Sequence, residues 1–226
     1  MTDPEPSEDL DADEPRAADG RVPGRRGRAT RQRLLECTSA MLRTTSYRDL
    51  KVVDIAKEAG TSPATFYQYF PDVESAVLVL ADEMVNEGVE TFAQLAHAMT
   101  WKGRSGYAGA EALADGVLTF WETHQPVLRV VDLATDEGDP RFANVRTRLL
   151  NDLNNTLAAA AKAHQAAGKG QPDLDPNAIG GVLVAMLAHV SAHRRGFEFW
   201  GVRSGDLRTT MARIVYWTVT GQKPPA

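Results

Sequence analysis

The sequence predicts an all-α protein of about nine helices, and two observations support this prediction. Apolar residues recur at the i, i+3, i+4, i+7 spacing of an amphipathic helix from about residue 29 to about residue 220. A side-chain acceptor followed directly by proline, which is typical of a helix start, occurs at Ser62-Pro63, Asp139-Pro140 and Asp175-Pro176. Hydrophobic residues make up 43% of the 226 residues, so most of the chain is able to fold around a core.

The composition also excludes several classes of protein. No apolar run approaches the ~18 residues of a membrane span, and the first twenty residues lack the basic and apolar segments of a secretion signal. We therefore expect a cytoplasmic protein with no membrane partner. The single cysteine, Cys37, cannot form an internal disulfide or a zinc ribbon.

The charge is distributed unevenly along the chain, although the net charge is only −5. Residues 1–19 hold eight acidic residues and one arginine, whereas residues 20–70 hold ten Lys or Arg against four acids. The acidic and proline-rich residues 1–24 are expected to be a disordered tail, which either only aids solubility or competes with DNA for the adjacent arginines. The basic segment that follows is typical of a surface that binds phosphate.

The stretch 52–70 predicts two short helices joined by a tight turn. Gly60 is able to take a positive φ just past the end of the first helix, and Ser62 is a side-chain cap at the start of the second. In the second helix Phe66 and Phe70 point together toward a core, so the other side of the helix faces outward. This arrangement is a helix-turn-helix, whose second helix enters the major groove of DNA. The face of the first helix that packs in the core consists of Val52, Ile55, Ala56 and Ala59.

The run DIAKEAGTSPATFYQYFPDVESAV resembles the signature of the TetR family of transcriptional repressors, and TFYQYFPD looks most like its ethionamide-repressor branch. The resemblance covers residues 28 to 80. It implies a three-helix DNA-binding head at residues 25–70 and a ligand-binding and dimerisation body at residues 71–226. A double-stranded DNA operator, a small-molecule effector and a second copy of the chain are the implied partners.

The predicted contacts to DNA come from the recognition helix, the turn before it and nearby cations. Gln68 is suited to pair with adenine and Thr65 to contact a thymine methyl group, while the amides of Thr61 and Ser62 are expected to meet phosphate. The arginines before the head form either an arm that reaches the backbone or minor groove, or a solvated basic leader. The full set is Arg25, Arg26, Arg28, Lys51, Thr61, Ser62, Ala64, Thr65, Tyr67, Gln68 and Tyr69.

Two of the positions that depart from the TetR pattern concern DNA binding. Lys51 stands where many relatives have a Ser or Thr that caps the helix at residue 52, so this chain lacks that cap and has a cation for a phosphate instead. Val73 stands where relatives have a phosphate-binding lysine, which leaves more of the affinity for DNA to the arginines and Lys51.

The body is expected to contain six helices. They start near Asp72, after the loop 100–106, at Pro126, at Pro140, at Pro176 and at about residue 206. The resemblance implies a dimer interface made by the last two helices, and the apolar residues expected in it are Ile179, Val182, Leu183, Met186, Val190, Met211, Ile214 and Val215. Aromatic and sulfur side chains that either line a ligand pocket or only fill the core are Met84, Trp101, Tyr107, Phe120, Trp121 and Phe197.

No cofactor, metal site or catalytic residue is predicted. His189 and His193 lie four residues apart, but no third ligand is evident, so we interpret them as structural or interface residues. The motifs of nucleophilic, metallopeptidase and P-loop enzymes do not occur. The sequence therefore predicts a repressor that leaves its operator when a small apolar or amphipathic effector binds the body. The alternative is a helical carrier or enzyme with a basic N-terminal segment.

Overall fold

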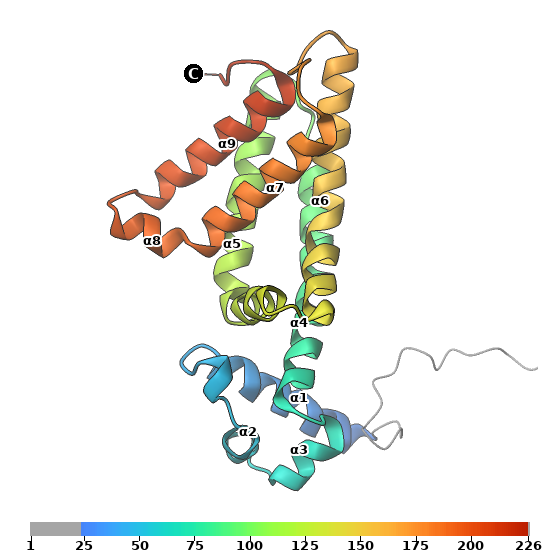
Figure 1. Ribbon diagram of the computed structural model, residues 1–226, viewed down its shortest axis with the longest axis vertical. Helices are drawn as coiled ribbons and strands as arrows, with labels where there is room; N and C mark the ends of the chain where they lie inside the picture. Colours follow the sequence, from blue (N-terminus) through green and yellow to red (C-terminus); the bar gives the residue numbers. More distant parts are fainter. Residues whose placement is uncertain (1–23, 226) are drawn as a thin grey trace, which may run out of the picture. The chain divides into compact units, whose positions relative to one another are not determined.

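The computed structural model describes residues 24–225, and all regular structure within this range is helical, as predicted (Figure 1). Nine α-helices and one short 3-10 helix occur there, with the bounds α1 Arg25–Met41, η1 Tyr47–Asp49, α2 Val52–Glu58, α3 Pro63–Tyr69, α4 Val73–His97, α5 Gly103–Asp136, α6 Pro140–Ala166, α7 Pro176–Ala192, α8 Arg194–Phe199 and α9 Ser204–Thr220. The predicted tail at residues 1–24 lies outside the described residues, apart from Gly24.

The described residues divide into two compact units between Leu80 and Ala81. The first unit, residues 24–80, contains α1, η1, α2, α3 and the first residues of α4. The second unit, residues 81–225, contains the remainder of α4 and the helices from α5 to α9. Helix α4 is therefore the segment through which the chain passes from one unit to the other.

The first unit has its own apolar core, in which α1, α2 and α3 contact one another. The phenyl rings of Phe66 and Phe70 in this core lie 5.5 Å apart, and the guanidinium of Arg31 lies 5.3 Å from the centre of the Phe70 ring. The expected inward direction of both phenylalanines is confirmed by their burial. Other buried side chains of this core are Leu34, Leu35, Ile55 and Ala56.

Helix α1 begins earlier than the apolar pattern predicted. It spans Arg25–Met41 instead of residues 29 to 44, so Arg25, Arg26 and Arg28 belong to its first turns. The prediction of a separate arginine arm is therefore wrong for these three residues. The reason is that α1 starts in polar residues, where apolar periodicity gives no signal, although arginine is a good helix former.

The second unit is built around α5, which contacts α6, α7 and α9. Helix α4 approaches closely at Gly88, where an added Cβ would lie 2.3 Å from Leu149 Cδ1 and 2.8 Å from Phe120 Cζ. A larger residue at this position would require those two side chains to shift, because they occupy the space that a Cβ would need. The interior is further filled by Leu113, Val117, Phe142, Leu157, Leu187 and Tyr216.

The prediction of a separate helix starting at Pro126 is wrong. Helix α5 continues through this proline from Gly103 to Asp136, and Figure 1 shows its later part running in a different direction from its first part. Proline has no N–H to donate to the preceding turn, and its ring crowds the carbonyl four residues earlier, so it bends a helix without always ending it. The flanking apolar residues Val127 and Val130 are buried and hold the second half of α5 in the core.

The two helix starts that were predicted from Asp-Pro pairs in the second unit are confirmed. The carboxylate of Asp139 accepts a hydrogen bond from the Arg141 amide, and that of Asp175 accepts one from the Ala178 amide, each with proline in the first turn. Sequence patterns missed the short helix α8, whose six residues are too few for a periodic signal. Along residues 24–225, none of the helices combines the length and the apolar character that crossing a membrane requires.

Candidate functional site

The turn between α2 and α3 has the geometry that the sequence predicted. Gly60 has a φ of +66°, and its amide donates to the Lys57 carbonyl oxygen over 3.1 Å. The next amide, that of Thr61, donates to the Ala56 carbonyl oxygen over 2.8 Å, which completes a Schellman motif at the end of α2. The Thr61 amide is therefore occupied inside the turn, and the expectation that it binds phosphate is wrong.

Helix α3 starts with a side-chain cap. The hydroxyl of Ser62 accepts a hydrogen bond from the Thr65 amide over 3.2 Å, with Pro63 as the first helical residue. The same hydroxyl lies 3.0 Å from Thr65 Oγ1. Because this contact engages the Thr65 hydroxyl, the methyl group is the part of that side chain left to meet a thymine methyl.

One face of α3 is turned away from the core of the first unit. Phe66 is fully buried, whereas the neighbouring Tyr67 is 52% exposed, and their rings meet edge to face 5.9 Å apart. Ala64 and Gln68 are exposed on the same helix, and Tyr69 is half-buried. The helix thus presents aromatic, amide and small side chains, the types that contact base edges and phosphates in a major groove.

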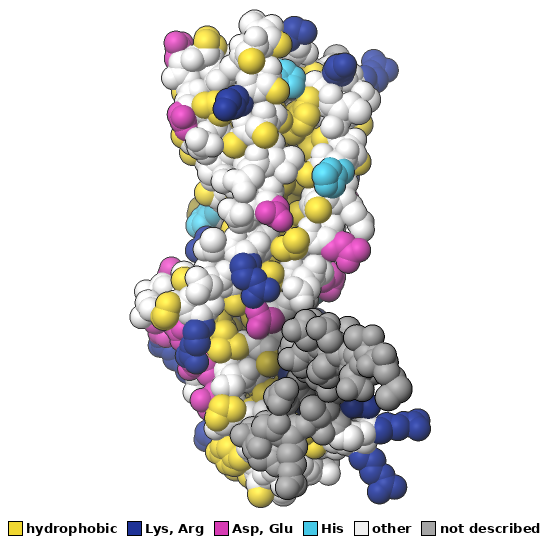
Figure 2. Space-filling view, turned by 90° about the vertical axis from the view of Figure 1, so that its right-hand side faces the viewer, with side chains coloured by type: hydrophobic (Ala, Val, Ile, Leu, Met, Phe, Trp, Pro, Cys, Tyr) yellow, Lys and Arg dark blue, Asp and Glu magenta, His cyan; other side chains and the backbone are white. Residues whose placement is uncertain are grey.

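Four cations predicted to bind DNA lie on the surface of the first unit. Arg25, Arg26 and Arg28 are exposed in α1, and Lys51 is exposed directly before α2. Figure 2 shows Lys and Arg side chains standing out from the surface of this unit. Lys51 occupies the N-cap position of α2, and its side chain makes no capping hydrogen bond, which confirms the loss of a cap there. The position leaves the ammonium group to solvent or to a phosphate.

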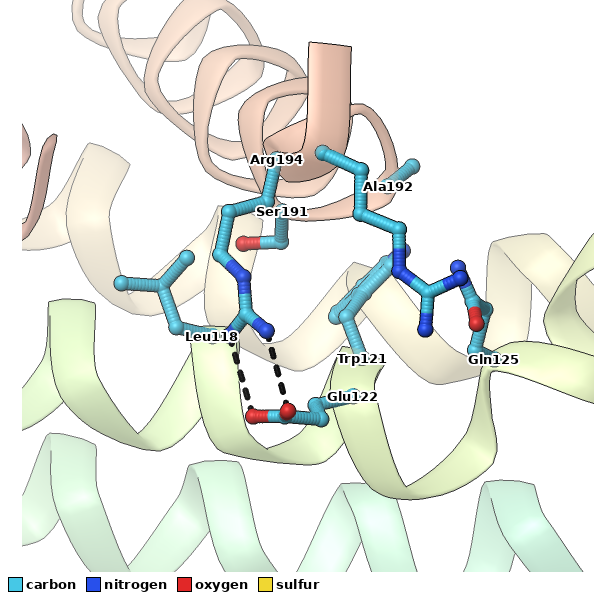
Figure 3. Close-up of a pocket in the computed structure, with 8 residues that line it drawn as sticks. Leu118, Trp121, Glu122, Gln125, Ser191, Ala192 and Arg194 are labelled. Atoms are coloured by element: carbon cyan, nitrogen blue, oxygen red, sulfur yellow. Dashed lines mark hydrogen bonds and ion pairs between the residues drawn. The ribbon is translucent and has the colours of Figure 1, made fainter. Parts of the chain in front are cut away.

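The second unit contains a small pocket between α5 and the corner where α7 meets α8 (Figure 3). Its volume is about 50 Å³. Apolar, charged and amide side chains line it. The lining residues are Leu118, Trp121, Glu122 and Gln125 from α5, with Ser191, Ala192, Arg194 and Arg195 from the corner.

A fork-shaped ion pair joins the two sides of this pocket. Arg194 Nη1 and Nη2 donate to the two carboxylate oxygens of Glu122 over 3.0 and 2.9 Å, as the dashed lines in Figure 3 show. The hydrogen bonds from Arg194 lower the pKa of Glu122 below its ordinary value, and in return they raise the pKa of Arg194. The Ser191 hydroxyl is buried beside this pair, and none of the described residues accepts or donates a hydrogen bond to it.

Comparison with known proteins finds a matching family for the N-terminal part and for the C-terminal part of the chain. Residues 34–75 match the family described as bacterial regulatory proteins, tetR family. Residues 92–226, more than half of the chain, match the tetracyclin repressor-like C-terminal domain. The chain belongs to the TetR family. It is therefore a DNA-binding transcriptional regulator, and because this family is not one of enzymes, the alternative of an enzyme is set aside.

Curated relatives resemble this TetR-family chain over a short stretch. The transcriptional regulator EthR of Mycolicibacterium smegmatis is 41% identical over 64 residues, which are 28% of this chain and 26% of that protein. EthR of Mycobacterium tuberculosis is 41% identical over 54 residues, 24% of this chain and 25% of that protein. The chain thus matches about a quarter of the length of these relatives, a partial similarity to the branch that the sequence indicated.

Solved structures share the fold over most of the chain. FadR from Bacillus halodurans, a fatty acid degradation regulator, is 16% identical with a TM-score of 0.64, covering 91% of this chain and all of that one. FadR from Bacillus subtilis, solved in complex with stearoyl-CoA, is 14% identical with a TM-score of 0.62, covering 84% of this chain and 98% of that one. At these identities the likeness concerns the fold alone.

Each of the two pockets described in the second unit is lined by one of the six residues predicted for a ligand pocket of this TetR-family body. Met84 and Phe120 are core residues, and Phe120 packs 5.1 Å from Phe92. Three of the four remaining rings lie apart from one another: Tyr107 contacts Tyr216, Phe197 contacts Trp200, and Trp101 borders a hollow of about 370 Å³ together with Lys102, Gly103, Ala163, His164, Ala167, Lys169 and Gln222. Only Trp121 borders the pocket of Figure 3. The burial of Met84, Trp101, Phe120 and Trp121 fits the alternative that these side chains fill the core, and the ligand pocket of the body stays a prediction.

The eight residues predicted for the dimer interface fall into two groups. Ile179, Leu183, Met211 and Val215 are buried within the single chain, so their assignment to an interface is corrected to the protomer core. Val182, Met186, Val190 and Ile214 remain at least partly exposed. Helices α7 and α9 pack against α5 and α6, which accounts for the burial of these four residues. Helical periodicity marks a buried face but does not show whether the same chain or a second copy covers it.

Sequence reasoning missed several exposed aromatic residues and one long-range ion pair in the second unit. Trp217 on α9 is 58% exposed, Phe199 at the end of α8 is 89% exposed, and Trp200 directly after α8 is 74% exposed. Glu122 and Arg194 lie 72 residues apart, and no spacing rule pairs residues at that distance. The imidazole rings of His189 and His193 stack 4.1 Å apart, and His193 Nδ1 lies 3.0 Å from the His189 carbonyl oxygen, which fits the structural interpretation of this pair.

Proposed function

We propose that this regulator is a homodimeric repressor, which leaves its operator when a small apolar or amphipathic molecule binds the second unit. The observation that carries the proposal is the outward face of α3, held in place by the Gly60 turn and the Ser62 cap. A capped recognition helix in one compact unit, with a separate helical unit attached, is what a ligand-responsive DNA reader needs.

In this proposal α3 reads bases, and the cations supply most of the affinity. The exposed Gln68 amide hydrogen-bonds an adenine, while Thr65, Tyr67 and Tyr69 contact neighbouring base edges or phosphates. Helix α3 contains no Lys or Arg, so phosphate contacts come from Arg25, Arg26, Arg28 and Lys51. The backbone amide of Ser62, at the start of α3, binds a further phosphate.

A gel-shift titration against the DNA upstream of the protein's own coding region tests this division of roles. Gln68→Ala should lose discrimination at one or two base positions by about 1–3 kcal/mol and leave non-specific binding unchanged. Arg28→Ala should weaken binding to every DNA sequence and reduce the salt dependence by about one phosphate contact. An equal loss on all sequences for Gln68→Ala would contradict the assignment of α3 as the base reader. Absence of any sequence-dependent complex at physiological salt would instead favour a helical carrier.

The proposed dimer uses the exposed apolar side chains of α7 and α9. Val182 on α7 is 68% exposed, and Ile214 and Trp217 on α9 are 39% and 58% exposed. Large apolar side chains gathered on two adjacent helices favour burial against an identical surface. A two-fold dimer also suits two DNA half-sites about 34–36 Å apart.

Light scattering coupled to size-exclusion chromatography tests the dimer. Val182→Glu should convert a dimer into a monomer and weaken operator binding, because the carboxylate would be buried in the interface of both copies. Leu174→Glu is the matched control, since Leu174 is also exposed, at 49%, but lies in the connection between α6 and α7. A Val182→Glu variant that remains dimeric would contradict the use of this face.

The effector is proposed to act through α4, which belongs to both units. An effector that prefers one arrangement of the second unit shifts the spacing of the two recognition helices by differential binding alone. The stearoyl-CoA bound by FadR of Bacillus subtilis supports an amphipathic effector as the class to test first. A thermal-shift screen of acyl-CoA, fatty-acid and other amphipathic compounds should find a ligand that raises the Tm and dissolves the operator complex. A ligand that raises the Tm and strengthens the operator complex would contradict the repressor mechanism.

A further inference from the structure

The pocket between α5 and the α7–α8 corner contains a buried polar group that lacks a partner. The Ser191 residue is only 8% exposed, and its Oγ finds no hydrogen-bond partner among the described residues. Buried hydroxyls in folded proteins nearly always have a partner, so an unpaired one beside a cavity marks a place where another molecule completes the bonding. The hydroxyl borders the pocket next to Arg194 (Figure 3).

The Arg194 guanidinium is already arranged for a planar group with two oxygens. It holds Glu122 by two hydrogen bonds of 3.0 and 2.9 Å, and its Nε lies 3.4 Å from Glu198 Oε1. The Glu122 side chain is 63% exposed, whereas that of Arg194 is 23% exposed. The carboxylate therefore approaches from the solvent side and is able to swing away, while the guanidinium stays at the pocket.

We propose that this pocket binds the carboxylate of an amphipathic acid, which replaces Glu122 on Arg194 and accepts a hydrogen bond from the Ser191 hydroxyl. Glu122 is then an internal competitor that occupies the site in the absence of ligand. The proposal rests on the effector-binding function proposed above and names the chemical class of the effector. Its apolar part would lie along Leu118 and Trp121, which form the apolar wall of the pocket.

The dimensions and charges of the pocket fit a head group of this kind. Its volume of about 50 Å³ holds a few water-sized groups, which suits a carboxylate and not a whole ligand. Arg195 and Gln125 also line the pocket, and Arg195 adds a second positive charge near Glu122. The indole of Trp121 stacks on Phe92 at 6.3 Å, so the apolar wall continues into the aromatic core between α4 and α5.

The exchange has a structural consequence, because the Glu122–Arg194 pair links α5 to α8. A ligand carboxylate on Arg194 removes that link and replaces it with a bond to a molecule that also contacts α5. Binding is thereby coupled to the attachment of the α7–α8 corner to the centre of the second unit.

Isothermal titration calorimetry of the full chain with octanoate and octan-1-ol tests the proposal, since the two probes share a chain length and differ in charge. Octanoate should bind the unchanged protein at least about tenfold more tightly than octan-1-ol, as expected for charge-assisted hydrogen bonds. Glu122→Gln should tighten octanoate binding by about tenfold and leave octan-1-ol unaffected, because a neutral amide competes poorly for the guanidinium. Arg194→Gln should abolish the preference for octanoate, and Ser191→Ala should weaken octanoate binding by about three- to tenfold.

The matched control is Asp82→Asn. Asp82 pairs with Arg148 over 2.7 Å between α4 and α6, so this variant also breaks an exposed interhelical ion pair, and its affinity for octanoate should be unchanged. Circular dichroism confirms the fold of each variant, and Glu122→Gln alters an exposed side chain only, so it keeps the test decisive if Arg194→Gln unfolds. Equal affinity for the two probes, or an unchanged octanoate affinity in Glu122→Gln, overturns the proposal.

The calorimetry does not involve DNA, so this proposal and the proposed function fail separately. Absence of an operator complex in the gel shift would overturn the repressor function while the pattern of variants still supports carboxylate binding. The opposite result is an operator complex that dissociates with neutral amphiphiles, together with an octanoate affinity that the Glu122 and Arg194 variants leave unchanged. That result would overturn the carboxylate site and keep the repressor function.

Discussion

Replacing Lys51 by serine should make the protein more stable and a weaker DNA binder at the same time. Lys51 holds the N-cap position of α2 with φ −114° and ψ 142°, the extended backbone that a capping residue adopts, yet its side chain makes no capping hydrogen bond. Its carbonyl oxygen already accepts from the Asp54 amide over 3.0 Å, so a serine hydroxyl at this position would lie within reach of the same first turn. Asp54 in that turn already complements the helix dipole.

The two effects have magnitudes that can be measured separately. A serine cap stabilises a helix start by about 1 kcal/mol relative to a residue that does not cap, and in a chain of this size this raises the Tm by about 2–4 °C. Removing the Lys51 ammonium lowers the slope of log K against log salt by about 0.9 for each phosphate that it neutralises. Thermal unfolding monitored by circular dichroism gives the first quantity, and operator titrations at several salt concentrations give the second.

Lys57→Ser is the matched control for this prediction. Lys57 lies on the same helix and carries the same charge, but it sits in the last turn, where a serine caps nothing. The control should not raise the Tm. The reasoning would be refuted if Lys51→Ser lowered the Tm, or if it left the salt dependence of operator binding at the value of the unchanged protein.

Three further predictions concern stability. Phe66 is fully buried and packs 5.5 Å from Phe70, so Phe66→Ala should cost about 3–5 kcal/mol in urea unfolding and Phe66→Leu clearly less; equal midpoints for the two would show that the ring is not part of the core. Asp175→Ala should lose about 1 kcal/mol because the carboxylate accepts from the Ala178 amide over 2.9 Å, while Asp175→Asn should retain most of the stability, and thermal melts of both variants decide whether this cap matters. Hydrogen bonds from Arg194 lower the pKa of Glu122 in the folded protein, so its ionised form contributes stability above the ordinary carboxyl value of 4.5, and this contribution is lost as the pH falls through the lower folded value. The Tm difference between the unchanged protein and Glu122→Gln should therefore be largest at neutral pH and disappear in acid, and a difference that grows toward acid pH would contradict the assigned cause.

Features that depend on neighbouring residues along the chain were predictable from the sequence. The Gly60 turn, the Ser62 cap and the Asp-Pro starts of α6 and α7 follow from backbone geometry within a few residues, and the structure has all of them. The inward direction of Phe66 and Phe70 follows from helical periodicity over a single turn. The same local signals carry the resemblance to the TetR family, because the helix-turn-helix lies within nineteen consecutive residues, 52–70.

Features that depend on which helix packs against which were decided only by the tertiary structure. Apolar periodicity marks a face as buried but does not name what buries it, so Leu183 and Val215 looked equally suited to a dimer interface and to the α5–α6 side of the protomer. The local sequence at Pro126 predicts a helix start, but α5 continues through this proline because Val127 and Val130 pack in the core. Glu122, Ser191 and Arg194 meet because α5 and the α7–α8 corner approach each other in space. Sequence patterns report interactions between residues a few positions apart, whereas the contact among these three residues exists only because the helices pack together in the folded core.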